Sequence, residues 1–153
     1  MDYRKLSFSL ILCLFAGYLG SVLNSVSINT WYPTIIKPSF TPASIIFPIV
    51  WTILYILMGI SLYIILVKNS VHYKKLLMIF SVQLVLNVLW SFFFFTLKSP
   101  LLGLIEIIIL DIAVLVNMIY FYKVSKTATY LLSPYFAWII FATILNISIF
   151  ILN

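Results

Sequence analysis

The chain alternates between long apolar stretches and short polar breaks, and the apolar stretches have the length of membrane-spanning helices. A helix needs about 20 predominantly apolar residues to cross the hydrocarbon core of a bilayer. The five predicted spans cover residues 6–26, 44–67, 76–97, 101–122 and 131–152. All connections except the first are short, which favours antiparallel neighbours. We therefore predict an all-α integral membrane protein, a compact bundle of five transmembrane helices that forms a single domain over residues 1–153.

Composition and charge narrow the class and suggest an orientation. Hydrophobic residues make up 65% of the chain and charged residues 8%, which a soluble domain of this size could not bury. The net charge of +6 is spread over the loops without a basic face, so we expect no nucleic-acid partner. Most basic residues flank the spans on the side of the N-terminus, and only Lys37 and Lys98 lie on the other side. The positive-inside rule then predicts a cytoplasmic N-terminus and an outer C-terminus.

The outer loop, residues 27–43, is the most distinctive segment of the sequence. It combines aromatic residues that can pack with prolines that limit its freedom, which is typical of an ordered loop. We interpret it as a lid over the bundle, with Trp31 in the lid and Trp51 in the wall below. Thr41-Pro42 and Ser99-Pro100 each place a capping hydroxyl before a proline, so helix starts are predicted at both positions.

Aromatic and amide side chains recur at intervals of four residues inside three spans, so each set lies on one face of its helix. Polar groups in lipid tend to face the bundle interior. At about 1.5 Å per residue, Trp51 and Trp90 lie about 10 Å below the outer boundary, whereas Trp138 lies at or below the midplane. These faces predict a cavity under the loop. They comprise Trp51 and Tyr55; Gln83, Asn87, Trp90 and Ser91; and Tyr135, Trp138, Ala142 and Asn146.

Two further groups allow more than one interpretation. Glu106 and Asp111 lie inside the fourth span, where carboxyl groups can mark a proton path. The alternative is that these carboxyls are neutral or paired with an amide or backbone group. Gly17 and Gly20 belong to a small-residue face of the first span, which we interpret as a surface for close helix packing within or between chains.

Three segments resemble the TspO/MBR family, which comprises bacterial tryptophan-rich sensory proteins and the mitochondrial translocator protein, also called the peripheral-type benzodiazepine receptor. They are WYPTIIKPSFTPASIIFPIVWTILYILMG, LNVLWSFFFF and LLSPYFAWIIFATILN. The resemblance extends over nearly the whole chain. It implies a five-helix bundle, commonly a homodimer, in a bacterial cell membrane. It also implies binding of tetrapyrroles, sterols and benzodiazepine-like ligands below the first loop, and some bacterial members break down protoporphyrin in light.

The resemblance also assigns roles to individual residues. Trp51 and Trp138 match the tryptophans implicated in porphyrin binding and breakdown, and are the expected catalytic residues of any such reaction. Positions around the family pocket are matched by Trp31, Tyr32, Pro42, Asn87, Trp90 and Asn146. The cholesterol motif of the animal members is absent, because no basic residue follows Lys126. The implication of sterol binding is correspondingly weaker.

The chemistry of a porphyrin fits the predicted cavity. A flat macrocycle stacks on indole faces, and its carboxylates favour the wet outer end, where Lys37 could meet them. The spans contain no histidine, and His72 lies in a loop on the opposite side, so haem iron has no obvious axial ligand. We therefore expect metal-free protoporphyrin IX as ligand or substrate, no metal site and no required cofactor.

Three functions stay open at this stage. The first is a membrane receptor for tetrapyrroles and similar hydrophobic molecules, with or without slow breakdown of the porphyrin by light and oxygen. The second is a transporter of porphyrins or other hydrophobic solutes that uses Glu106 or Asp111 as a proton switch. The third is a stress-response regulator whose occupancy controls a partner protein, for which the short loops leave little surface.

Overall fold

The computed structural model describes residues 2–68 and 73–153, and the regular elements in these ranges are all helical. A four-residue helix, α2 (Ser27–Thr30), lies in the first loop, and a π-helical turn, η1 (Phe92–Thr96), continues α4. The long helices are α1 (Tyr3–Asn24), α3 (Ile46–Val67), α4 (Tyr73–Ser91), α5 (Pro100–Tyr122) and α6 (Lys126–Leu152). With η1 added to α4, all five are long and apolar enough to cross a membrane, which confirms the predicted bundle. His72 lies outside the described residues.

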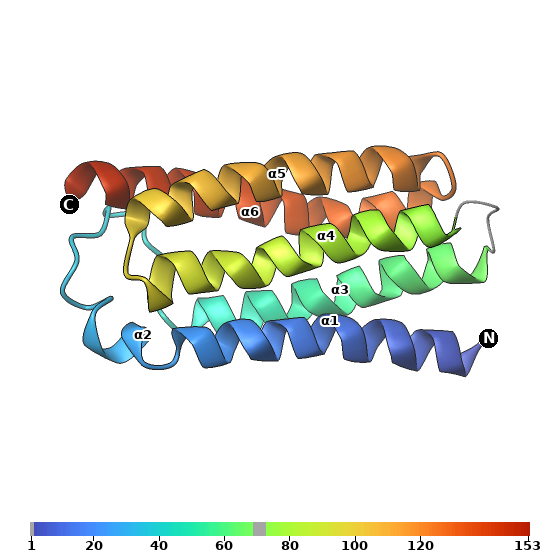
Figure 1. Ribbon diagram of the computed structural model, residues 1–153, viewed down its shortest axis with the longest axis horizontal. Coiled ribbons are helices and arrows are strands. Elements are labelled where there is room, and N and C mark those ends of the chain that lie inside the picture. The colour runs from blue at the N-terminus through green and yellow to red at the C-terminus, as the bar shows by residue number, and fades with distance from the viewer. Residues whose placement is uncertain (1, 69–72) are drawn as a thin grey trace.

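The five long helices run up and down alongside one another (Figure 1), and their contacts close them into a ring. Each packs on two main neighbours, in the order α1, α3, α6, α5, α4 and back to α1. The N-terminus lies at one end of the bundle, and the C-terminus lies at the other end beside α2 and the first loop (Figure 1). We call these the N-terminal end and the loop end. Which end faces the cytoplasm stays a prediction.

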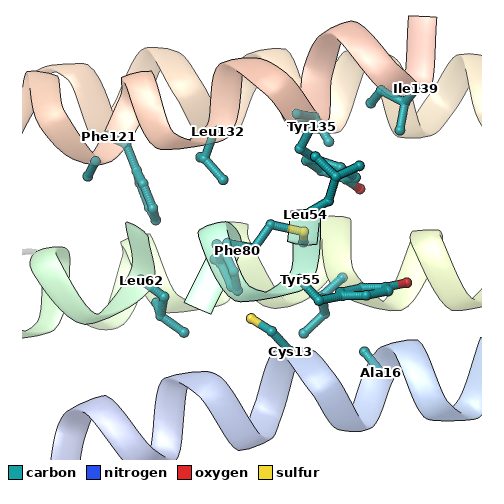
Figure 2. Close-up of a cluster of buried hydrophobic side chains, with 14 of the residues drawn as sticks. Cys13, Ala16, Leu54, Tyr55, Leu62, Phe80, Phe121, Leu132, Tyr135 and Ile139 are labelled. Carbon is teal, nitrogen blue, oxygen red and sulfur yellow. The ribbon is translucent and has the colours of Figure 1, made fainter. Parts of the chain in front are cut away.

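A buried apolar core fills the ring on the N-terminal side of Tyr55 and Tyr135. All five long helices contribute to it, with Cys13 from α1 and Leu62 from α3 among them (Figure 2). The Phe80 and Phe121 rings, from α4 and α5, stack with centroids 5.9 Å apart. Helices α1 and α3 approach closely here: a Cβ on Gly59 would lie 3.1 Å from the Cα of Leu10. The core holds this half of the bundle closed.

Of the two helix starts predicted from the sequence, one was confirmed and one was wrong. Ser99 is the N-cap of α5, since its Oγ accepts a hydrogen bond from the backbone N–H of Leu102 (3.2 Å), and Pro100 is the first helical residue. The start at Thr41-Pro42 was wrong. The Thr41 hydroxyl donates to the carbonyl of Pro38 (2.7 Å) and forms a turn within the loop, and α3 begins only at Ile46. Local hydrogen bonding of the threonine to its own loop competed with capping.

Helix α6 begins one turn before the predicted span and tolerates an internal proline. Ser125 caps it by accepting from the N–H of Ala128. Pro134 has no N–H and leaves the carbonyl of Tyr130 without its usual donor. The Ser133 hydroxyl donates to that carbonyl instead, at 2.7 Å. This local repair allows α6 to continue to Leu152.

Candidate functional site beneath the first loop

The loop-end half of the bundle contains a cavity of about 600 Å³. Its walls come from α1, α3, α4, η1 and α6, and Tyr32 reaches it from the loop above. Helix α5 contributes no lining residue within the described part of the chain. Nine of the predicted residues line this cavity: Tyr32, Trp51, Tyr55, Asn87, Trp90, Ser91, Trp138, Ala142 and Asn146. The structure therefore gathers residues from four separate segments of the sequence around one space.

The other five predicted residues do not line the cavity, and one of them, Gln83, is completely buried on α4. Trp31 packs edge-on against Phe94, with ring centroids 5.6 Å apart. Lys37 points back into its own loop, Pro42 is a half-buried loop residue, and Tyr135 is completely buried below the cavity. Their places indicate support of the site rather than contact with a ligand.

A chain of three buried side chains forms the floor. The Tyr55 hydroxyl donates to Oδ1 of Asn87, and Nδ2 of Asn87 donates to the Tyr135 hydroxyl at 3.0 Å. Figure 2 shows the hydroxyls of Tyr55 and Tyr135 directed toward the same end of the bundle, the end toward which α6 runs from Leu132 to Ile139. The chain joins α3, α4 and α6, and Asn87 is only 4% exposed. Each of the three side chains has a buried hydrogen-bond partner, so the chain constrains the three helices relative to one another.

A second amide orients one indole of the wall. Oδ1 of Asn146 accepts a hydrogen bond from Nε1 of Trp90 (3.2 Å), and its Nδ2 donates to the carbonyl of Pro100 (2.9 Å). A Cβ on Gly103 would lie 3.1 Å from the same Oδ1. Asn146 thus fixes the Trp90 ring at the loop end of α5 and, like Asn87, is hydrogen-bonded across helices.

Trp51 and Trp138 line the cavity from α3 and α6. Trp51 stacks on Tyr55 with centroids 5.5 Å apart and meets the edge of Tyr135 at 6.3 Å. Trp138 meets Phe47, one turn closer to the loop end than Trp51, at 6.0 Å. The predicted depth of Trp138 was therefore wrong, since it lies above Trp51 rather than below it.

The error in depth comes from the length of α6. The estimate counted inward from residue 152 as though that residue lay at the membrane boundary. Helix α6 has 27 residues, or about 40 Å at 1.5 Å per residue, which exceeds the ~30 Å hydrocarbon core. Its last turns reach the level of the loop, because Asn153 pairs with Ile36. Every residue of α6 is thereby shifted toward the loop end.

The π-helical turn provides the surface on which the loop packs. Phe94 and Phe95 are successive residues, yet both are buried. Trp31 packs on Phe94, and Tyr32 lies 5.6 Å from Phe95 between ring centroids. Burial raises the pKa of the Tyr32 phenol above its ordinary value. A π turn at the end of a membrane helix was not predicted from the sequence, because four consecutive phenylalanines give no periodic signal.

The far side of the loop is held by the end of α6. Nδ2 of Asn153 donates to the carbonyl of Ile36 (3.0 Å), and Oδ1 of Asn153 accepts from the N–H of Ile36 (2.9 Å). Between these two attachments, Nζ of Lys37 donates to the carbonyls of Tyr32 (2.7 Å) and Ile35 (3.2 Å). The ammonium also lies 4.7 Å from the centroid of the Tyr32 ring. Lys37 thus stabilises the loop, and the predicted lid is ordered.

Several lining residues were not among the predicted site residues. Gly17 and Gly20 line the cavity and let Tyr55 and Ser91 approach α1, so their predicted role in close packing is confirmed within the chain. Phe47 completes the aromatic wall. Asn24 also lines the cavity, and its Oδ1 is buried without a hydrogen-bond partner among the described residues. The polar residue in an otherwise apolar span was the available signal for Asn24.

The carboxyl groups of α5 lie apart from the cavity. Glu106 is 4% exposed, and neither of its carboxylate oxygens has a hydrogen-bond partner among the described residues. Oδ2 of Asp111 accepts a hydrogen bond from the Thr143 hydroxyl at 2.8 Å. Across residues 2–68 and 73–153, no three His, Cys, Asp or Glu side chains come together as metal ligands would.

Comparison with known proteins agrees with this architecture. Residues 9–152 match the model of the TspO/MBR family. The chain is 44% identical to a tryptophan-rich protein TspO of Archaeoglobus fulgidus over 153 residues, which covers 100% of this chain and 99% of the relative. It is 43% identical to the protein of the same name from Chlorobaculum tepidum, over 93% of this chain and 91% of the relative. The human translocator protein is 31% identical over 76% of this chain and 70% of its own length.

Proposed function

Since the chain belongs to the TspO/MBR family of membrane sensor and translocator proteins, we propose that it is a receptor for tetrapyrroles. The ligand class is protoporphyrin IX and similar flat hydrophobic molecules, bound in the cavity beneath residues 27–43. The observation that carries the proposal is the cavity itself. It combines a volume of about 600 Å³ with three indole rings, those of Trp51, Trp90 and Trp138. Ligand sites typically have about 300–1,000 Å³ and largely aromatic walls.

The polar groups of the cavity suit the edge of such a ligand. Lys37 is engaged with loop carbonyls, so it is not proposed as the partner of the porphyrin carboxylates. Neutral side chains line the loop end instead, namely Asn24, Ser25, Asn29 and Ser44. The amide of Asn24 is the strongest candidate, because its Oδ1 atom is buried and has no hydrogen-bond partner among the described residues. Amide O and N positions can exchange by a flip, so Asn24 can present a donor to a carboxylate.

Titration of protoporphyrin IX into the detergent-solubilised protein tests the receptor proposal. We expect saturable quenching of tryptophan fluorescence at micromolar concentrations, because three of the four tryptophans face the cavity. Trp31→Phe is the matched control. It removes a tryptophan that does not line the cavity and should leave most of the quenching, whereas Trp90→Phe should reduce it. No saturable quenching at micromolar protoporphyrin would refute the proposal.

We further propose that the bound porphyrin is slowly broken down in light, with dioxygen as the oxidant. The support is the position of Trp51 and Trp138, two oxidisable rings that line the same cavity. Absorbance spectra of the complex under illumination, with and without oxygen, measure the reaction. The double variant Trp51→Phe with Trp138→Phe should slow the loss of the porphyrin bands. If loss continues at the same rate per bound porphyrin, the catalytic part of the proposal fails and binding stands.

The homodimer and a bacterial cell membrane remain proposals that rest on family membership alone. Chemical cross-linking of the protein in native membranes checks the dimer, since a second band at twice the monomer mass is expected. A single monomer band at saturating cross-linker would contradict it.

A further inference from the structure

The cavity is closed at the floor and partly covered at the loop end. The floor is the hydrogen-bonded chain of Tyr55, Asn87 and Tyr135. The cover is held at two places, by the packing of the loop aromatics on η1 and by the paired hydrogen bonds between Ile36 and Asn153. A ligand that entered from the water by displacing the loop would have to break these contacts.

The side of the bundle between α1 and α3 differs. At the N-terminal end the two helices are joined, with Lys5 Nζ donating to the carbonyl of Leu66 at 3.2 Å. Their contact continues up to Gly17, where a Cβ would lie 2.6 Å from the Tyr55 ring. Beyond that level, residues of both helices line the cavity. The two helices thus enclose the cavity between their loop-end halves.

Four residues on this side line the cavity and are also exposed on the surface of the bundle. Tyr18 is 63% exposed, and Ser21 is exposed on the same helix. Pro48 and Thr52 are exposed on α3, and all four line the cavity. Side chains that line the cavity and are also exposed indicate that the cavity opens beside them, and this opening continues toward the loop end, where other lining residues are exposed as well. In a membrane-spanning bundle, this opening between α1 and α3 faces lipid rather than water.

We propose that ligands enter the cavity laterally from the bilayer, through a portal between α1 and α3 lined by Tyr18, Ser21, Pro48 and Thr52. This inference rests on the proposed function, because it describes the route to the same site. It defines the ligand class as molecules already dissolved in the loop-end leaflet, with a flat apolar body and a polar edge. The hydroxyl-bearing side chains of the portal can stay hydrogen-bonded to that edge during entry. The loop remains in place throughout.

Two variants separate the lateral route from entry past the loop. Ile36→Cys with Asn153→Cys places two thiols where the loop meets the end of α6, and their oxidation to a disulfide, verified by thiol titration, locks the cover. The native Cys13 is fully buried and does not compete. The same protein after reduction is its own control. Thr52→Phe narrows the portal, and Ile53→Phe is its control, because Ile53 is exposed on α3 without lining the cavity.

The measurement is the association rate, followed by stopped-flow tryptophan quenching in vesicles that contain protoporphyrin IX. We expect the locked protein to bind as fast as its reduced form. Thr52→Phe should slow both association and dissociation by about tenfold, because a narrowed passage hinders both directions, while Ile53→Phe matches the native protein. Slower association of the locked protein would overturn the portal, and so would unchanged rates in Thr52→Phe. If the native protein shows no saturable quenching, the proposed function fails and not the route.

Discussion

Replacing Gly17 by alanine should displace Tyr55, one of the three residues of the floor, although Gly17 itself is not part of the floor. An ideal Cβ at position 17 lies 2.6 Å from both Cδ2 and Cε2 of Tyr55, below the 3.0 Å at which something must move. The Tyr55 ring is not free to move, because its hydroxyl is bonded to Asn87 and its face is stacked on Trp51. Overpacking of this kind costs about 1–3 kcal/mol. Alanine also favours the helix by up to ~1 kcal/mol over glycine, which offsets part of this cost.

Gly59 offers a matched control on the same pair of helices. A Cβ there lies 2.9 Å from a Cδ2 and 3.1 Å from the Cα of Leu10, but Gly59 is in the core and does not line the cavity. Both alanine variants should therefore lower the midpoint of thermal unfolding, measured by circular dichroism in detergent. Only Gly17→Ala shifts Tyr55 and Trp51, and with them the wall on which the ligand stacks.

The binding assay decides between damage to the floor and general loss of stability. If returning Tyr55 to its native position for binding costs the Gly17→Ala variant about 1.4 kcal/mol, its Kd for protoporphyrin IX rises about tenfold. Gly59→Ala should bind as the native protein does, at a temperature where both variants are folded. Equal affinities for the two variants would refute the assignment of Tyr55 as part of the floor.

Three more outcomes are expected. Asn87→Leu leaves two buried tyrosine hydroxyls without their partner, so it should destabilise the fold by about 1–3 kcal/mol per hydroxyl in thermal unfolding; an unchanged midpoint would contradict the hydrogen-bonded floor. Glu106→Gln and Asp111→Asn should leave porphyrin affinity unchanged, because neither residue lines the cavity, while loss of pH-driven uptake into proteoliposomes in these variants would favour the transporter instead. The raised pKa of Tyr32 means that the folded state holds its phenol proton more tightly than the unfolded state, so this group's stabilisation is lost as pH rises above about 10. Tyr32→Phe should therefore show a smaller loss of stability above that pH, and an identical loss would refute the link.

The sequence was sufficient for the bundle and for much of the site. Long apolar stretches specify membrane helices directly, and a spacing of four residues places Asn87 and Ser91 on one face whatever the neighbouring helices do. Two kinds of feature could not be predicted from the sequence. Depth depends on where each helix crosses the membrane, and the sequence could not show that the last turns of α6 lie level with the loop. The place of Lys37 depends on loop carbonyls that only the folded loop brings within 2.7 Å of its ammonium.

The π-helical turn at Phe92–Thr96 makes the cover of the cavity dependent on a single backbone position. A π turn is equivalent to one residue inserted into an α-helix, so deletion of one phenylalanine from the run would let α4 continue as an ordinary helix. The helix itself would lose little. Residues beyond the deletion would rotate by about 100°, the angle between successive residues at 3.6 per turn, and Phe94 and Phe95 could no longer both face Trp31 and Tyr32. The length of this phenylalanine run, more than its hydrophobicity, therefore determines whether the loop has a surface to rest on.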